Sequence, residues 1–304
     1  MQKPILRLFK KYVAFIFVLI IALLACLACS QVDPDKSVEY VRFQAHRGVS
    51  SDAPENTMAA FRLAADYGYS HIELDPAATK DGVIVILHDN TVTRTAREPT
   101  VPPPLPVVDP ADYPARIDRL TYDEVAQFDF GSYFSDKYIG EKIPRFDEVL
   151  EFAKKRKITL KLDAKIWRLS QENIETIFAS VQNSKAPVGI TCATVQQAER
   201  AVARLVRPEI HYDGAVTEDV LRQLSALPIG ELYVWLPYKS IVSESDGADK
   251  IVTETAALVK QYARLGIWTI DKEEQLDAAV SAYADIIETN GRLKPRPIAI
   301  KPVP

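Results

Sequence analysis

The chain has 304 residues, 47% of them hydrophobic and 26% charged, with a formal net charge of −4. This composition is typical of a globular protein with one large domain or two small ones. The weakly acidic balance gives no support for nucleic-acid binding through a basic surface. Only Cys192 lies beyond residue 30, which excludes an intramolecular disulfide or a cysteine-based zinc site in that part of the chain.

Residues 1–30 have the pattern of an export signal, in which four basic residues precede the uncharged run Tyr12–Ala28. Cys26 and Cys29 follow small residues and resemble the lipobox of bacterial lipoproteins, in which the cysteine is lipidated and becomes the mature N-terminus. The alternative is an uncleaved membrane anchor, because 17 apolar residues are near the lower limit for a span. Both interpretations predict an exported protein, periplasmic or at the cell surface and attached to the membrane. Residues 31–38 are polar and predict a tether.

From residue 39 onward, short apolar runs alternate with longer amphipathic segments. The predicted strands are Val41–Ala45, Ser70–Asp75, Val83–Leu87, Thr159–Leu162, Val188–Cys192, Glu209–Tyr212, Glu231–Leu236, Gly266–Ile270 and Asp285–Glu288. The predicted helices are Asn56–Tyr67, Tyr122–Gln127, Phe146–Arg156, Gln171–Gln182, Val195–Leu205, Glu218–Leu224, Val252–Arg264 and Glu273–Ala282. This alternation predicts parallel strands joined by right-handed crossovers.

A (β/α)₈ barrel over residues 39–304 is the expected architecture, since barrels of this type contain roughly 250 residues. Nine predicted strands are one too many, and we expect Glu209–Tyr212 and Glu231–Leu236 to compete for one position. A doubly wound open sheet is the alternative. Polar residues end each of the first four predicted strands, which favours a barrel, because its strand ends form one common mouth.

A proline-rich segment interrupts the alternation after the third predicted strand. Residues 97–118 contain seven prolines, which favour extended polyproline II conformations over elements of a core. In a barrel, a loop at this position overhangs the active site. The segment is therefore a candidate lid or specificity loop, and a surface loop without a role is the alternative.

Three carboxylates, Glu73, Asp75 and Asp163, stand at or just after the ends of predicted strands. Residues two apart in a strand share a face, so Glu73 and Asp75 point the same way. Converging carboxylates in a half-buried mouth require protons or a cation. All-oxygen ligands favour Mg²⁺ or Ca²⁺ over zinc. The alternative is that each carboxylate forms a salt bridge or caps a helix.

Two histidines also end predicted strands, His46 the first and His88 the third. A pair at one mouth beside carboxylates is suited to acid–base catalysis. His71 starts its strand and is expected at the opposite rim in a structural role. Arg47 and Lys165 place positive charge near the mouth, where a guanidinium can bind phosphate oxygens. These residues favour metal-assisted chemistry on a phosphate ester.

Five ordered motifs carry a family resemblance. They read A-H-R-G at 45–48, P-E-N-T at 54–57, E-L-D at 73–75, T-K-D-G at 79–82 and L-H-D at 87–89, and the match continues to 267–270 and 284–287. The chain resembles the glycerophosphodiester phosphodiesterase family. The resemblance implies a (β/α)₈ barrel that hydrolyses glycerophosphodiesters to sn-glycerol 3-phosphate and an alcohol.

The resemblance also implies residue roles. His46 and His88 would be the general acid and base, Glu73 and Asp75 would bind a divalent cation, and Arg47 would bind the phosphate. The family's E-x-K motif, which holds the third metal ligand, reads Asp163-Ala164-Lys165 here. The further candidate substrate contacts are Lys165 and Trp268. Asp271 stands where the family often has asparagine.

Three other functions remain open. A sphingomyelinase D or phospholipase D-like enzyme acting on lysophospholipids would share the paired carboxylates, but T-K-D-G at 79–82 and the motif around Trp268 favour the diesterase. A binding lipoprotein without catalysis would keep the fold, and the intact histidine pair argues against it. A metal-dependent sugar or isomerase barrel is disfavoured by Arg47 and the two histidines.

Overall fold

The computed structural model describes residues 38–97, 116–245, 248–251 and 253–303. The chain divides into two compact units, Met1–Glu39 and Tyr40–Pro304, and every element described below belongs to the second. The predicted leader 1–30 and nearly all of the predicted tether and proline-rich segment lie outside the described residues. Within the described ranges, no helix has the length and apolarity needed to span a membrane.

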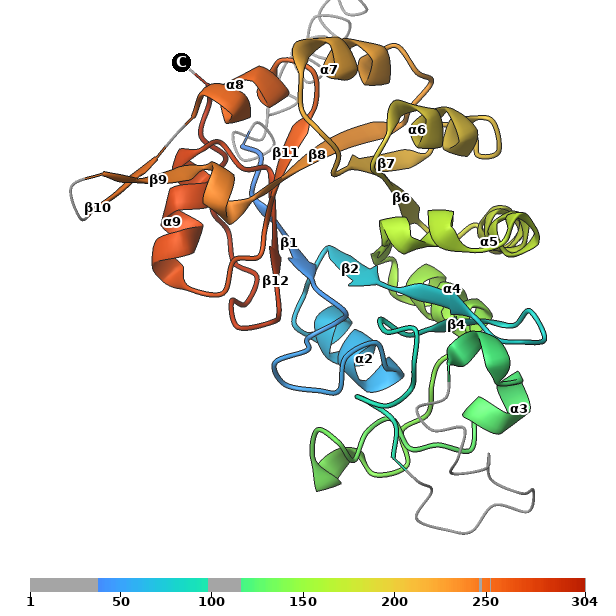
Figure 1. The fold of residues 1–304 in the computed structure, drawn as a ribbon. Coiled ribbons are helices and arrows are strands. Elements are labelled where there is room, and N and C mark those ends of the chain that lie inside the picture. The colour runs from blue at the N-terminus through green and yellow to red at the C-terminus, as the bar shows by residue number, and fades with distance from the viewer. Residues whose placement is uncertain (1–37, 98–115, 246–247, 252, 304) are drawn as a thin grey trace, which may run out of the picture. The chain divides into compact units, whose positions relative to one another are not determined.

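Eight parallel strands form a closed barrel, which confirms the predicted architecture (Figure 1). In barrel order they are β1 (Arg42–Ala45), β12 (Ile286–Thr289), β11 (Arg264–Trp268), β8 (Glu231–Pro237), β7 (Glu209–Tyr212), β6 (Val188–Cys192), β5 (Thr159–Leu162) and β2 (His71–Leu74). The barrel closes through β1, which pairs with β12 on one side and with β2 on the other. The first strand along the chain therefore lies beside the last.

Seven α-helices accompany the barrel strands among the described residues. They are α2 (Met58–Asp66), α4 (Phe146–Arg156), α5 (Gln171–Ser184), α6 (Val195–Val202), α7 (Glu218–Ser225), α8 (Glu254–Lys260) and α9 (Glu273–Ser281). α4 shows why these segments are helical. Its buried face contains Val149, Leu150 and Ala153, and its acidic first turn and basic last turn complement the helix dipole.

The strand predicted at Val83–Leu87 is present, but its placement in the parallel barrel was wrong. This segment contains β4 (Ile84–Ile86), which pairs antiparallel with β3 (Pro76–Ala78) outside the barrel. The two segments expected to compete, now β7 and β8, both belong to the barrel and pair with each other. Burial alone explains the error, because β4 is as apolar and as buried as a barrel strand.

A separate small core buries one face of this hairpin, whereas Ala78, Ile84 and Ile86 pack in the main hydrophobic core. Ala77 and Val85 of the hairpin pack with Phe128, Phe130 and other apolar residues from the connection between β2 and α4. That connection also contains α3 (Tyr122–Val125), shorter than the predicted helix. Leu87 belongs to the same core, so this core holds the backbone in place immediately before His88.

A second antiparallel hairpin, β9 (Val242–Ser245) and β10 (Ala248–Ile251), was not predicted. The helix predicted for Val252–Arg264 is also shorter, because Arg264 already belongs to barrel strand β11.

Candidate active site

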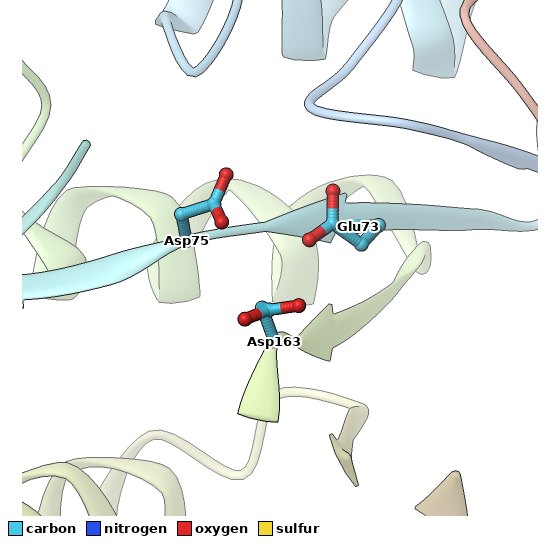
Figure 2. Close-up of side chains that lie close together, drawn as sticks. All are labelled: Glu73, Asp75 and Asp163. Carbon is cyan, nitrogen blue, oxygen red and sulfur yellow. The ribbon is translucent and has the colours of Figure 1, made fainter. Parts of the chain in front are cut away.

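Three carboxylates converge at the carboxyl ends of two neighbouring strands. Glu73 lies in β2, Asp75 follows that strand, and Asp163 follows β5. The parallel pairing of β2 with β5 brings these strand ends side by side. One oxygen from each carboxylate lies within 4.8 Å of the others, and the side chains face one another in Figure 2.

The pKa values of Glu73 and Asp75 are shifted in opposite directions. Burial, followed by the charge of Asp75, raises the pKa of Glu73 well above its ordinary value. Burial also works against ionisation of Asp75, but attraction to Lys165 and a 2.8 Å hydrogen bond from Asn56 Nδ2 outweigh it and lower the pKa of Asp75. Burial and the neighbouring carboxylates thus oppose full ionisation of the cluster, and a divalent cation would relieve both effects.

A layer of polar side chains lies inside the barrel near the cluster. Lys161 Nζ donates a 3.1 Å hydrogen bond to Glu288 Oε2, and Gln44 Nε2 donates to the same oxygen at 2.5 Å. The Lys161 ammonium also lies 4.2 Å from the centre of the Trp235 ring. Since Glu288 contributes to the raised pKa of Glu73, this layer acts on the site without forming part of its surface.

His46 is held by a chain of two side chains. Asn290 Nδ2 donates to Asp271 Oδ2 at 2.5 Å, so Asn290 Oδ1 is left to accept from His46 Nδ1, 2.7 Å away. A 2.9 Å bond from the Asn290 backbone N–H to Asp271 fixes the amide further. His46 Nε2 is then the free nitrogen, and it lies 3.9 Å from Glu73 Oε2.

His88 follows β4 and is oriented by a different network. Its Nδ1 lies 2.6 Å from Asp89 Oδ1, and Arg94 donates to both oxygens of Asp89. The hydrogen bonds from Arg94, acting against partial burial, lower the pKa of Asp89 to about 2. Arg94 also pairs with Glu55, which accepts from Arg47 at 3.0 Å. An ion-pair chain thus connects the His88 loop with the residue after His46.

Arg47 and Lys165 both contact the carboxylate cluster. The Arg47 backbone N–H donates to Glu73 Oε2 at 3.0 Å, and its Nε lies 3.5 Å from Asp75 Oδ2. Lys165 Nζ donates to Asp75 Oδ1 at 2.7 Å and to the His88 carbonyl at 3.2 Å. Lys165 lies in the 3₁₀ helix η5 (Ala164–Arg168), where its backbone N–H donates to Asp163 Oδ1. In these positions, either cationic side chain can bind a phosphate oxygen in place of its contact with Asp75.

The sharp turn after β1 depends on backbone conformation. Arg47 has φ of 56°, in the left-handed region, and the next residue, Gly48, has φ of 79°. A Cβ on Gly48 would lie 2.6 Å from Ala60 Cβ, so a side chain does not fit there. This turn aims the Arg47 backbone N–H at Glu73.

The remaining predicted site residue, Trp268, ends β11 and is 42% exposed. Its strand end belongs to the same rim of the barrel as those of β2 and β5. His71 lies at the opposite rim as expected, at the start of β2, with its Nε2 3.3 Å from Glu209 Oε1. His211, which the sequence left ambiguous, is fully buried and shares the same carboxylate at 2.8 Å.

Several residues that shape the site had no role in the sequence prediction. Glu55 and Asn56 belong to the P-E-N-T motif at 54–57, so the motif contained the signal but not the contacts. Asp89 is part of the L-H-D motif, and Arg94 follows nearby. Asn290 lies outside the quoted motifs, and only closure of the barrel between β12 and β1 brings it to His46.

A closed parallel barrel with carboxylates and His46 at the carboxyl ends of its strands, and His88 on the neighbouring hairpin, has the architecture of a (β/α)₈-barrel enzyme. The sequence model of the glycerophosphoryl diester phosphodiesterase family matches residues 46–290. The chain belongs to this family, which confirms the resemblance inferred from the motifs.

Named relatives agree with this assignment. A glycerophosphodiester phosphodiesterase of Caldanaerobacter subterraneus is 39% identical over 35% of this chain, and mouse glycerophosphodiester phosphodiesterase 1 is 34% identical over 46%. The matched segments span only 38% and 40% of those two proteins. The glycerophosphodiester phosphodiesterase of Bacillus altitudinis matches at 25% identity over 81% of this chain and 93% of its own length.

Solved structures share the fold. An Oleispira antarctica phosphodiesterase, determined in complex with its product sn-glycerol-3-phosphate, has a TM-score of 0.63 at 20% identity, covering 83% of this chain and 94% of its own. The Thermotoga maritima glycerophosphodiester phosphodiesterase has a TM-score of 0.58 at 19% identity, covering 84% and 96%.

Proposed function

We propose that this protein hydrolyses glycerophosphodiesters to sn-glycerol 3-phosphate and an alcohol, with a divalent cation, Mg²⁺ or Ca²⁺. The observation that carries the proposal is the convergence of Glu73, Asp75 and Asp163 within 4.8 Å, beside two histidines that have separate orienting partners. Family membership and the substrate class in the names of its relatives support the same reaction.

The residues fit a hard cation. Glu73, Asp75 and Asp163 offer only oxygen ligands, and the burial and neighbouring negative charges that raise the pKa of Glu73 are effects that a bound cation would offset. Both oxygens of Asp75 already face cationic or amide groups, so Lys165 must share or yield its position when a cation binds. When bound, the cation would neutralise charge on the phosphate oxygens.

The protein's own side chains would supply proton transfer and phosphate binding. Each histidine has its Nδ1 engaged, His46 by Asn290 and His88 by Asp89, which leaves both Nε2 atoms for proton exchange. One histidine would accept a proton from the attacking oxygen, and the other would donate a proton to the leaving alcohol. The guanidinium of Arg47 would bind a phosphate oxygen in place of its contact with Asp75.

The deciding experiment measures glycerol 3-phosphate release from glycerophosphoethanolamine by the full-length protein with Mg²⁺ or Ca²⁺, and then with EDTA. We expect release that EDTA abolishes. His46→Ala and His88→Ala should each lower kcat roughly 10²- to 10⁴-fold. A variant of either histidine that keeps more than about a tenth of the activity would contradict its catalytic role.

The rival functions give different results in the same experiment. Hydrolysis of lysophospholipid but not of glycerophosphoethanolamine would favour the phospholipase D-like reaction. Binding of the diester without turnover, by protein that is folded, would favour a binding lipoprotein.

We also propose that the protein is exported and attached to the membrane through residues 1–30, with residues 31–38 as the tether. The basic segment, the apolar run and the two cysteines support this proposal, which rests on the sequence alone.

A further inference from the structure

A pocket of about 530 Å³ opens beside His88 and Lys165. Its wall is built by β3, the segment 87–90 after β4, the 3₁₀ helix η3 (Ile117–Arg119) and η5, so it lies on the hairpin side of the carboxylate cluster. We call it the His88 pocket. Because a diester has two arms on one phosphorus atom, an arm on the His88 side of the cluster would extend into this pocket.

The acidic residues in the wall are already neutralised. Both oxygens of Asp118 accept from Arg116, at 2.9 Å from Nε and 2.7 Å from Nη2. Asp89 accepts from Arg94 and contacts His88. The acidic side chains of the pocket therefore have little capacity left to attract a cationic ligand.

Of the three basic residues in the wall, two have an acidic partner among the described residues and one does not. Lys165 is engaged by Asp75, and Arg116 is engaged by Asp118. Arg168, at the end of η5, lines the pocket and is exposed, with no ion-pair or hydrogen-bond partner in the part of the chain that the structure describes. A guanidinium without a partner offers planar, paired donors to a carboxylate or phosphate.

We propose that the His88 pocket binds the alcohol part of the substrate and prefers an alcohol that carries an anionic group, carboxylate or phosphate, to one that carries only a cation. This inference rests on the proposed function. Glycerol is uncharged and common to all substrates of the class, so a charged pocket discriminates among them only if it holds the variable alcohol. Arg168 is the specificity-determining residue.

The test compares kcat/KM for two matched substrate pairs with the full-length enzyme. Glycerophosphoserine differs from glycerophosphoethanolamine by one carboxylate, and glycerophosphoinositol 4-phosphate differs from glycerophosphoinositol by one phosphate. We expect the anionic member to be favoured about 3- to 10-fold, as for a partly exposed charge pair. Arg168→Glu should abolish or invert the preference, and Arg168→Lys should keep most of it.

The ratio within a pair cancels any loss of folded protein in a variant. Arg62→Glu is the matched control, because Arg62 is an exposed arginine of α2 outside the pocket, and it should leave both ratios unchanged. If the anionic member is preferred in just one of the two pairs, the proposal is supported, and that pair identifies which anionic group the pocket recognises.

Two results would overturn the proposal. Equal kcat/KM within both wild-type pairs, or ratios that Arg168→Glu does not change, would refute the role of the pocket while leaving the diesterase function standing. Absence of hydrolysis of all four substrates would refute the proposed function and this inference with it.

Discussion

His46 depends on two side chains that do not touch the substrate in the proposed reaction. Asp271 holds the side chain and backbone of Asn290, and Asn290 holds His46 Nδ1. Asparagine is common in the family at the position of Asp271, so a hydrogen-bonding residue of this size is suited to the task. The network sets which nitrogen of His46 is free and where it points.

Removal of Asp271 should therefore damage catalysis more than binding. For Asp271→Ala we expect kcat to fall about 10-fold or more, with KM and the metal requirement changed less than about twofold, because the imidazole loses its orientation while Arg47 is untouched. Asp271→Asn keeps one acceptor oxygen of two, so we expect it to lower kcat less than Asp271→Ala does. Steady-state measurement of kcat and KM tests this prediction. An unchanged kcat in Asp271→Ala would show that Asn290 orients His46 without its hydrogen bonds to Asp271.

The three carboxylates repel one another, and a bound cation would offset this electrostatic repulsion. The charge of Asp163 is one of the causes that raise the pKa of Glu73. Asp163 has a shorter side chain than the glutamate usual in the family, but one of its oxygens still lies within 4.8 Å of the other ligand atoms.

Asp163→Asn should separate metal binding from folding. We expect the metal concentration for half-maximal activity to rise at least about 10-fold, because one of three anionic ligands is lost. Without metal, the melting temperature should stay the same or rise, because less like charge is crowded together. Titration of activity with Mg²⁺ or Ca²⁺ and thermal unfolding in EDTA provide the two measurements. A lower melting temperature with unchanged metal dependence would show that Asp163 is structural.

Among the elements, the β3–β4 hairpin precedes one of the two candidate catalytic histidines. His88 follows this hairpin, which packs between the small core and the main one, whereas His46 and the carboxylates lie on or just after barrel strands. The ion pairs from Asp89 through Arg94 and Glu55 to Arg47 connect the hairpin side with the turn after β1. The relative placement of the two histidines thus depends on this chain of contacts.

The opposite end of the barrel contains a buried titratable layer. His211 stacks on Tyr233, with ring centres 4.9 Å apart, and its Nδ1 accepts from Trp235 Nε1 at 2.9 Å. Burial, opposed by the hydrogen bond to Glu209, lowers the pKa of His211 from 6.5 to about 4. Burial works against ionisation of Glu209, but its hydrogen bonds to His211 and His71 lower the pKa of Glu209 below its ordinary value.

The stability of the fold should fall with acidification in two overlapping ranges. The unfolded chain binds a proton at His211 near pH 6.5, whereas the folded chain resists until about pH 4, so this stabilisation of up to about 3 kcal/mol is lost as the pH falls between those values. The contribution of Glu209 is present above its ordinary pKa and is lost below it. Urea unfolding of wild type and His211→Gln from pH 7.5 to 4.5 tests this. An equally steep pH dependence in the variant would contradict the role of His211.

At the scale of the whole chain, the sequence divides into an expected leader and tether and a catalytic barrel. The barrel contains every residue of the candidate site, and the family match begins only at residue 46. The proposed export signal and the candidate site therefore lie in separate parts of the chain, and the two proposals can be tested separately.

Replacement of both Cys26 and Cys29 by serine should remove the lipid anchor. We expect the protein to move from the membrane fraction to the soluble exported fraction, because one acyl group or more supplies the attachment. Diesterase activity per folded molecule should be unchanged. The single variants identify the lipidated cysteine. Retention of the double variant in the membrane, resistant to high salt, would favour the uncleaved anchor.

The sequence by itself determined the local elements and most of the site. α4 and strands β5, β6 and β7 have the predicted boundaries, because burial periodicity, caps and charge at helix ends are local properties. Most residues of the candidate site were also readable from the motifs, since polar side chains at the ends of buried strands stand out from an apolar background.

Only the tertiary structure decided which apolar segments enter the barrel and which distant residues meet. Periodicity reports burial but not the partner that provides it, so β4, which lies between the main core and the small core, looked like a barrel strand. Asn290 reaches His46 only because β12 pairs with β1, and no local pattern encodes a contact across 244 residues. Closure of the barrel depends on packing and hydrogen bonding over the whole domain, and only the closed barrel brings the residues of the separate motifs together in one site.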